Sequence, residues 1–377
     1  MPVGQAEEMV FPQHPGWYPA DLQVHSTFSD GEKDVAEVVK MLAARGYRIV
    51  YFTDHTDLMA KRWAEYKKAC YRASALRRPG GDIVALPGAE FSTGRRRSIS
   101  SVSDSGQEPG FRAWEKQGDL LAYGIRDAQG LENDTFSPQE GIDNVNLNLP
   151  GVSSAAIAHP YGDPAWKDWK VVGYRGVEIM SGVLQRDFGL NSRPVRRWRL
   201  EISRQLKDSI GQGCIPSPRA GSDYHGRWFD PGHAGYVTYI YLGLEWEGLS
   251  YWRRKAAVDA ALRQGRTVAS HKGSLAFLTV NGQVPGTVLF GIDPKTPLAL
   301  EIQLVAALEG RFVLEVYQDW RLLFRWRTCL GAGAGYRRSR EWHYPGGDHY
   351  YWLAASGDDY VYSSPIYVSS SAARLVK

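Results

Sequence analysis

The sequence predicts an α/β protein in which an amino-terminal barrel is followed by a small all-β domain. Between about residues 20 and 270, short apolar runs of β-forming residues alternate with longer stretches of helical periodicity, the pattern of repeated βα units. After about residue 272, alternating strands with hairpin signals replace the helices. We therefore predict a barrel domain over 1–272 and a sandwich-like β domain over 273–377.

Seven short apolar runs predict the strands of the first domain, enough to close a barrel. They are 21–26, 49–53, 83–86, 120–125, 155–159, 176–180 and 219–223. Helical periodicity predicts helices at 35–42, 61–78, 192–211 and 249–264, and Gly46 lies where a left-handed cap ends the first of them. Residues 94–118 are polar, Ser-rich and without clean periodicity, so we predict an inserted loop there.

Alternating apolar residues predict the strands of the second domain. The dipeptide Asn281-Gly282 directly follows the first of them and is a strong hairpin signal. The expected strands are 275–280, 298–305, 311–317, 350–355 and 360–368. No convergent polar set marks this domain, so a supporting role is our expectation for it.

Composition and charge narrow the class of protein. The formal net charge is only +4, which does not favour nucleic acid as a partner and leaves any anion to be recognised locally. Three widely spaced cysteines argue against a disulfide framework and a thiolate metal site. No apolar run has the length of a signal or membrane segment. We predict a cytoplasmic protein with no membrane partner.

Metal-binding residue types stand at the ends of five predicted strands. The carboxyl ends of barrel strands share one mouth, and a mixed histidine and carboxylate set is typical of Zn, Mn or Fe. A single histidine after an apolar run is more often a buried structural residue, so the inference depends on the whole set. The candidates are His25 with Asp30 in the next turn, His55, Glu90, His159, and Asp223 with His225.

This ordered set resembles the PHP (polymerase and histidinol phosphatase) family, whose motifs read HxH…SDG, DH, GxE, H, HP and DxH. The resemblance covers about residues 20–240. Ala260–Arg266 and Ser364-Pro365-Ile366 are similar to the CehA/McbA-type branch, which appends a β domain. The matching motifs here are His25…Ser29-Asp30-Gly31, Asp54-His55, Gly88-Ala89-Glu90, His159-Pro160 and Asp223-Tyr224-His225.

The resemblance implies a distorted (β/α)7 barrel that holds two to three divalent metal ions (Mn, Zn or Fe, with Mg also open). By motif position it implies that Glu90 bridges two ions and that Asp54 orients its neighbour rather than binding metal. The implied ligands are His25, Asp30, His55, Glu90, His159, Asp223 and His225.

The chain departs from the family pattern at two positions. Gln23 stands where the leading histidine of HxH is usual, and Asp119 stands where another ligand histidine is expected. Both exchanges replace an imidazole nitrogen with oxygen, which favours Mn or Mg or empties one metal position. For Asp119, an ordinary turn or N-cap residue remains the alternative.

The function that the resemblance implies is metal-dependent hydrolysis of a small-molecule phosphate ester by a metal-activated water. No side chain is assigned as nucleophile. Arg95, Arg96 and Arg219 are candidates for binding the substrate phosphate, with solvent exposure as their alternative.

Three other functions stay open. The CehA/McbA-like branch also contains carboxylic and carbamate ester hydrolases, and a nuclease for short nucleic acids is a further enzymatic alternative. A degenerate barrel that binds a ligand without turnover is the non-enzymatic one, because histidines are missing at 23 and 119. The retained carboxylates argue against it, since such a cluster is costly without a cation.

Overall fold

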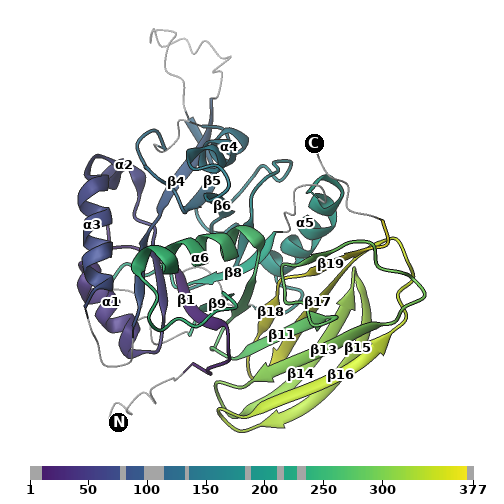
Figure 1. Ribbon diagram of the computed structural model, residues 1–377. Coiled ribbons are helices and arrows are strands. Elements are labelled where there is room, and N and C mark those ends of the chain that lie inside the picture. The colour runs from purple at the N-terminus through teal and green to yellow at the C-terminus, as the bar shows by residue number, and fades with distance from the viewer. Residues whose placement is uncertain are drawn as a thin grey trace.

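The computed structural model describes residues 11–76, 82–96, 114–131, 136–182, 188–209, 216–226 and 235–371. The fold is mixed α/β: helices and strands of the amino-terminal part lie beside a carboxyl-terminal part built of strands (Figure 1). In these described ranges, no helix combines the length and the hydropathy that crossing a bilayer requires. The cytoplasmic location stays a prediction.

Two sheets build the amino-terminal part. In the first, three neighbouring strands run parallel: β1 (Trp17–Val24), β2 (Ile49–Phe52) and β3 (Val84–Pro87). Strands β9 (Val237–Tyr241) and β10 (Thr267–Ser270) extend this sheet on the other side of β1. The second sheet has the order β4 (Ala89–Arg96), β5 (Trp114–Tyr123), β6 (Ser154–Ile157), β7 (Gly176–Ser181) and β8 (Ser217–Gly221).

Backbone hydrogen bonds connect the two sheets at two seams. Beside β2 and β4, the Glu90 amide donates to the Asp54 carbonyl at 3.2 Å. Beside β1 and β8, the His25 amide donates to the Tyr224 carbonyl at 2.9 Å. These residues follow or begin their strands, so the seams bring the carboxyl ends of β1, β2 and β8 close to the start of β4.

Strand β5 differs from the predicted βα alternation, because it runs antiparallel to both β4 and β6. The predicted insert at 94–118 is therefore partly wrong: 94–96 belong to β4 and 114–118 to β5, while 97–113 lie outside the described residues. These ends of the two strands are polar and show no apolar alternation. Periodicity therefore did not predict them as strand.

The helices follow their capping and apolar signals. Helix α1 (Val35–Ala44) begins at Asp34, whose side chain accepts the Glu37 amide in a capping box, and it ends before Gly46, with φ +87°. Three other predicted helices correspond to α3 (Trp63–Ser74), α5 (Arg193–Ser209) and α6 (Tyr251–Gln264). The prediction missed α4 (Pro138–Asn148), although Ser137 and Glu140 form a capping box there.

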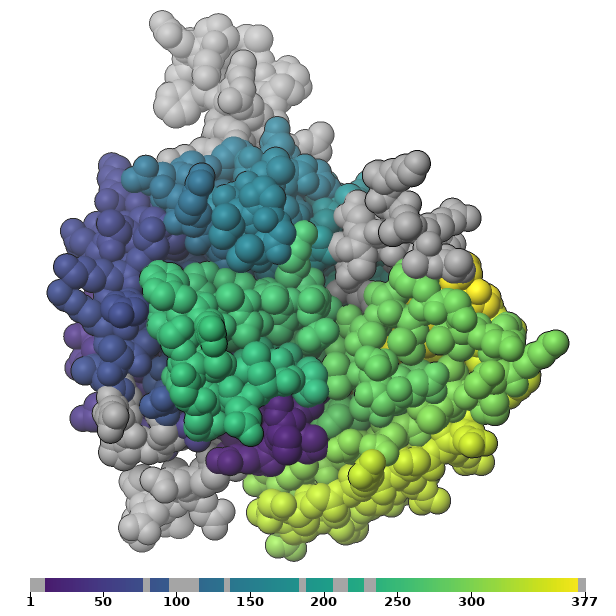
Figure 2. Space-filling model, viewed as in Figure 1, coloured from purple at the N-terminus to yellow at the C-terminus, as the bar shows by residue number. Residues whose placement is uncertain are grey.

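A buried core lies between the two amino-terminal sheets and α6. Inward-facing residues such as Leu22 of β1, Tyr51 of β2 and Tyr123 of β5 contact one another and Leu262 of α6. Figure 2 shows α6 covering one face of the molecule between the amino-terminal part and the carboxyl-terminal strands. The candidate ligands follow the carboxyl ends of the strands that line this core.

The carboxyl-terminal part consists of strands in two sheets. One sheet has the order β11 (Leu275–Val280), β13 (Leu298–Val305) and β16 (Gly335–Trp342). The sheets contact each other where the Arg340 guanidinium of β16 lies 4.6 Å from the centre of the Phe324 ring of β15. The other strands are β12 (Val288–Leu289), β14 (Gly310–Gln318), β15 (Arg321–Leu330), β17 (Asp348–Gly357), β18 (Val361–Ser363) and β19 (Ile366–Ser369).

Three features here differ from the sequence prediction. The predicted strand 360–368 is two strands, because β18 ends before Ser364-Pro365 and proline has no amide to donate. Strands β15 and β16 were not predicted, since arginines interrupt their apolar alternation. Strand β10 pairs with β18, so hydrogen bonds cross the predicted boundary, and the division at 272 stays a prediction.

Candidate metal centre

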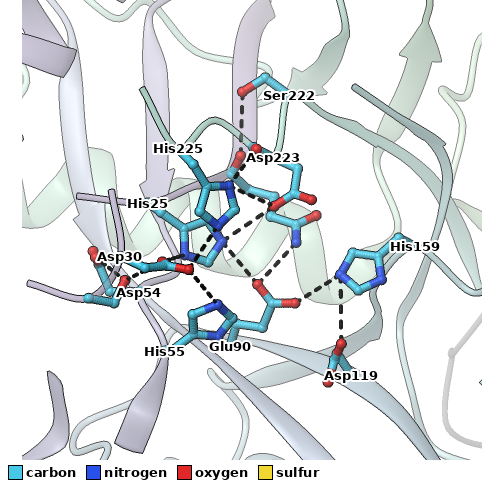
Figure 3. A network of polar contacts seen from close by, with 12 residues as sticks. His25, Asp30, Asp54, His55, Glu90, Asp119, His159, Ser222, Asp223 and His225 are labelled. Atoms are coloured by element: carbon cyan, nitrogen blue, oxygen red, sulfur yellow. Dashed lines mark hydrogen bonds and ion pairs between the residues drawn. The ribbon is translucent and has the colours of Figure 1, made fainter. Parts of the chain in front are cut away.

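The predicted ligand residues converge at one place, where the carboxyl ends of the strands meet (Figure 3). Their side chains form three groups, and within each group the ligand atoms all lie within 4.8 Å of one another. We call them the histidine-rich group (His25, Asp30, His55, His225), the carboxylate-rich group (Glu90, Asp119, His159) and the shared group (His25, Glu90, Asp223).

Three separations in the histidine-rich group, all to Asp30, match those between two ligands of a tetrahedral ion. Asp30 Oδ1 lies 3.4 Å from His25 Nδ1, and Asp30 Oδ2 lies 3.4 Å from the Nε2 atoms of both His55 and His225. Two ligands bound tetrahedrally at about 2.1 Å stand about 3.4 Å apart. The group therefore fits one small divalent ion.

Local backbone geometry places these side chains. The Gly31 amide donates to the Ser26 carbonyl at 3.0 Å, and this tight turn returns Asp30 toward His25. A Cβ on Gly31 would lie 2.6 Å from backbone atoms of His25 and Ser26, so the turn requires glycine. His225 Nδ1 lies 2.9 Å from the Asp223 carbonyl, which orients the ring and leaves Nε2 for a ligand.

Asp54 is buried at the end of β2 and holds the loop that carries Asp30. Its carboxylate accepts the Ser26 amide at 2.8 Å, the Ser26 hydroxyl at 2.9 Å and the Ser29 hydroxyl at 2.7 Å. Asp54 is in none of the three ligand groups. Its contacts are those of a residue that positions ligands.

The carboxylate-rich group is assembled across β4, β5 and the end of β6. His159 Nε2 lies 3.0 Å from Glu90 Oε1 and 3.8 Å from Asp119 Oδ2. The Ser92 hydroxyl donates to Asp119 Oδ1 at 2.6 Å, and the two residues are directly paired across the antiparallel strands. Asp119 thus lies within a strand and not in a turn, because β5 continues on both sides of it.

The shared group reuses two of these residues. His25 Nε2 lies 3.0 Å from Glu90 Oε2 and 3.4 Å from Asp223 Oδ1. Gln23 Nε2 donates to the same Glu90 oxygen at 3.1 Å. Gln23 therefore contacts the Glu90 carboxylate directly. Glu90 lies between the histidine-rich group and the other residues of the carboxylate-rich group.

Charges at the site stabilise one another. Burial lowers the pKa of His159, but the Glu90 carboxylate raises it more, to about 10. Burial raises the pKa of Glu90, yet contacts with His159 and His25 hold it well below its usual range. Burial, followed by the Glu90 charge, raises the pKa of Asp119 to about 6. Because a cation must displace protons from the histidines, its affinity increases with pH.

The donors fit divalent cations. Both ring nitrogens of His25, which is fully buried, face carboxylate oxygens: Nδ1 lies 3.4 Å from Asp30, and Nε2 lies 3.0 Å from Glu90. Gln23 Oε1 and His159 Nδ1 are buried and have no hydrogen-bond partner among the described residues. Imidazole and carboxylate atoms that lie within 4.8 Å of one another in each group are the donor types that divalent cations take.

Two buried carboxylates beside the site were not predicted. Glu178 of β7 accepts the His159 amide at 2.8 Å, and burial raises its pKa well above the usual range. Asp21 of β1 accepts the Ser222 amide at 3.0 Å, and burial raises its pKa to about 7. The sequence holds one signal for Glu178: an acidic residue that follows Gly176-Val177 inside an otherwise apolar strand, which could have indicated a buried carboxylate.

Replacing Asp21 with asparagine is expected to change how stability depends on pH. Between pH 3.8 and about 7 the folded state keeps the Asp21 proton and the unfolded state has lost it, so wild-type stability falls as pH rises. Asparagine has no such proton. One pKa unit corresponds to about 1.4 kcal/mol, so from pH 5 to 7 the variant should gain about 2 kcal/mol of unfolding free energy relative to wild type.

Urea unfolding at several pH values measures this difference. Asp143→Asn is a matched control, because Asp143 is exposed on α4. Parallel pH curves for wild type and Asp21→Asn would contradict the raised pKa.

Of the three candidate arginines, Arg219 has a described side chain, and it is not brought to the ligand groups. Arg219 is 1% exposed, its guanidinium lies 4.7 Å from the centre of the Tyr123 ring, and Nη2 donates to the Leu262 carbonyl of α6 at 3.4 Å. It is thus directed into the core toward α6, which corrects the expectation of a phosphate-facing or exposed arginine. Arg95 and Arg96 end β4, and their side chains lie outside what the structure describes.

Comparisons with known proteins give distant likenesses. No protein-family model matches the sequence, and no curated protein matches it. The chain is similar to a two-domain protein from Bacteroides vulgatus described as containing a predicted PHP-like metal-dependent phosphoesterase, with 15% identity over 94% of this chain and 98% of the other and a TM-score of 0.46. An amidohydrolase from Chromobacterium violaceum, with bound sulfate and no metal, shows 16% identity over 63% of this chain and 96% of its own, with a TM-score of 0.35. Likenesses this distant assign neither an activity nor a substrate to the chain.

Proposed function

We propose that this protein is a metal-dependent hydrolase of the PHP type that cleaves small-molecule phosphate esters. The observation that carries the proposal is the convergence of three ligand groups around Glu90, with 3.4 Å separations in the histidine-rich group. The gathering of imidazole and carboxylate ligand atoms within 4.8 Å of one another in each group supports a role for cations. We also propose that the curved amino-terminal strands form a distorted barrel around the inner core.

The residues of the site have different proposed roles. His25, His55 and His225 with Asp30 would hold one cation, and Glu90 with Asp119 and His159 would hold another. When bound, the cations supply an activated water and polarise the bond that is attacked. Glu90 contacts one histidine of each of these two groups, His25 and His159, and Asp54 keeps Asp30 in place through Ser26 and Ser29.

Phosphate esters are the substrate class that the motif resemblance supports. The ordered motifs from His25 to His225 resemble those of phosphoesterases, while only the short segments near 260–266 and 364–366 resemble the carbamate and carboxylic ester hydrolases. Two adjacent cations would also suit phosphate chemistry, because such a pair can stabilise the attacking and the leaving oxygens together.

Elemental analysis together with a chromogenic ester screen tests the proposal. We expect at least two divalent ions per chain and turnover of p-nitrophenyl phosphate in preference to p-nitrophenyl acetate. His55→Ala should lose ions and turnover, whereas His343→Ala, at an exposed position outside the ligand groups, should keep both. A protein that stays metal-free after supplementation with Zn, Mn, Fe and Mg would refute the proposal, and turnover of the acetate alone would refute its substrate class.

A further inference from the structure

The two outer ligand groups differ in chemistry. The histidine-rich group offers three imidazole nitrogens and one carboxylate, from Asp30. The carboxylate-rich group offers two carboxylates, from Glu90 and Asp119, and one imidazole, from His159. Imidazole nitrogen suits zinc and its neighbours, while oxygen donors suit Mn and Mg. The two positions are therefore not equivalent.

The hydrogen bond to Asp119 strengthens this difference. Ser92 occupies Asp119 Oδ1 at 2.6 Å, which fixes the carboxylate with Oδ2 directed toward His159. Asp119 is 6% exposed and Glu90 is 2% exposed, so two carboxylates are held close together with little water. Burial of two such charges is costly unless a protonated histidine or a bound cation offsets them, and two carboxylates call for more positive charge than His159 alone supplies.

The shared group does not provide an independent third position. A neutral imidazole has one nitrogen lone pair for a metal, so a cation on His25 Nδ1 excludes one on Nε2. The Gln23 amide also directs an N–H at Glu90 Oε2, from 3.1 Å, where a cation of the shared group would bind. The shared group thus loses His25 when the histidine-rich group is filled, and Gln23 already donates a hydrogen bond to its Glu90 oxygen.

Gln23 leaves one oxygen available. Its side chain is fully buried beside Glu90, and Oε1 has no hydrogen-bond partner among the described residues. An amide oxygen is a neutral ligand that Mg and Mn accept and that zinc rarely selects. Gln23 therefore adds an amide oxygen to the residues that contact Glu90.

We propose that the site holds two different cations, an inference that rests on the proposed function. A zinc-class ion occupies the histidine-rich group, and an oxygen-preferring Mn or Mg ion occupies the carboxylate-rich group. The difference originates in Asp119, which supplies an oxygen donor to the carboxylate-rich group, and Gln23 contacts the Glu90 oxygen that faces His25. The protein is then a mixed-metal enzyme rather than a carrier of two or three identical ions.

Sequential titration of metal-free protein tests this assignment without an activity assay. One equivalent of Zn is added, and Mn binding is then followed by the loss of the free-ion signal in electron paramagnetic resonance. We expect the first Zn to bind at least 100-fold more tightly than a second Zn, and one Mn per chain to bind to the Zn-loaded protein. Two Zn ions of equal affinity that exclude Mn would overturn the proposal.

Asp119→His is the variant that should remove the asymmetry. It replaces an oxygen donor with nitrogen, so the second Zn should bind about tenfold or more tightly than in wild type, and Mn should weaken by a similar factor. Gln23→His should likewise raise Zn affinity. Asp143→His is the matched control, because it adds a histidine at an exposed position on α4.

The outcomes separate this proposal from the proposed function. Protein that binds neither Zn nor Mn refutes the proposed hydrolase itself. Protein that binds both ions, with affinities that Asp119→His and Gln23→His leave unchanged, keeps the hydrolase and overturns the mixed-metal assignment. Thermal unfolding of each variant, followed by circular dichroism, shows whether it is folded, and an unfolded Asp119→His leaves the wild-type titration to decide.

Discussion

Glu90→Gln is expected to lower kcat/KM for a phosphate ester by about a thousandfold and to reduce the bound metal by at least one ion per chain. Glu90 Oε1 lies 3.0 Å from His159 and Oε2 lies 3.0 Å from His25, so this one carboxylate belongs to two ligand groups. The amide removes its charge and directs an N–H at one of the rings. Loss of charge stabilisation of about 4 kcal/mol corresponds to about three powers of ten in rate.

Steady-state kinetics and elemental analysis on the same preparations measure both effects. Glu65→Gln is a suitable control, since Glu65 is exposed on α3 and pairs with Arg62 at the surface. If Glu90→Gln retained the wild-type metal content and rate, Glu90 would not be a metal ligand and the centre of the proposed site would be wrong.

The convergence of the candidate ligands could be predicted because most of them follow the end of an apolar strand. Parallel strands bring their carboxyl ends to the same place, so His25, His55 and His159 converge although more than 130 residues separate the first from the last. The structure adds what spacing cannot provide: the grouping of the side chains and the central place of Glu90.

The unpredicted features have a common physical cause. Glu178 and Arg219 are residues of ionisable type inside strands, and an analysis of sequence periodicity assigns such residues to the exposed face. Both are buried here, because Glu178 accepts the His159 amide and Arg219 packs on the Tyr123 ring. The direction of β5 could not be predicted either, because an antiparallel strand and a parallel strand have the same alternation of side chains. Such choices depend on contacts between distant segments.

Asp54→Ala is expected to lower the free energy of unfolding by about 3 kcal/mol and to weaken Zn binding about 100-fold. The change leaves the Ser26 amide and the Ser26 and Ser29 hydroxyls without their acceptor, and Ser26 is fully buried. The loop that carries Asp30 then loses its attachment to the end of β2. Asp30 contacts three histidines of the site, so a displaced Asp30 affects the whole histidine-rich group.

Urea unfolding of the metal-free protein and Zn titration measure the two effects separately. Asp54→Asn keeps an acceptor oxygen and should recover part of the stability and part of the affinity, while Asp57→Ala, at an exposed residue of α2 (Thr56–Met59), should change neither. Reduced stability with unchanged Zn affinity would assign Asp54 a structural role alone. If Asp54→Ala loses both stability and Zn affinity, and Asp54→Asn recovers part of each, Asp54 is the residue that positions Asp30. The reason is that displacement of Asp30 weakens Zn binding in proportion to the hydrogen bonds removed.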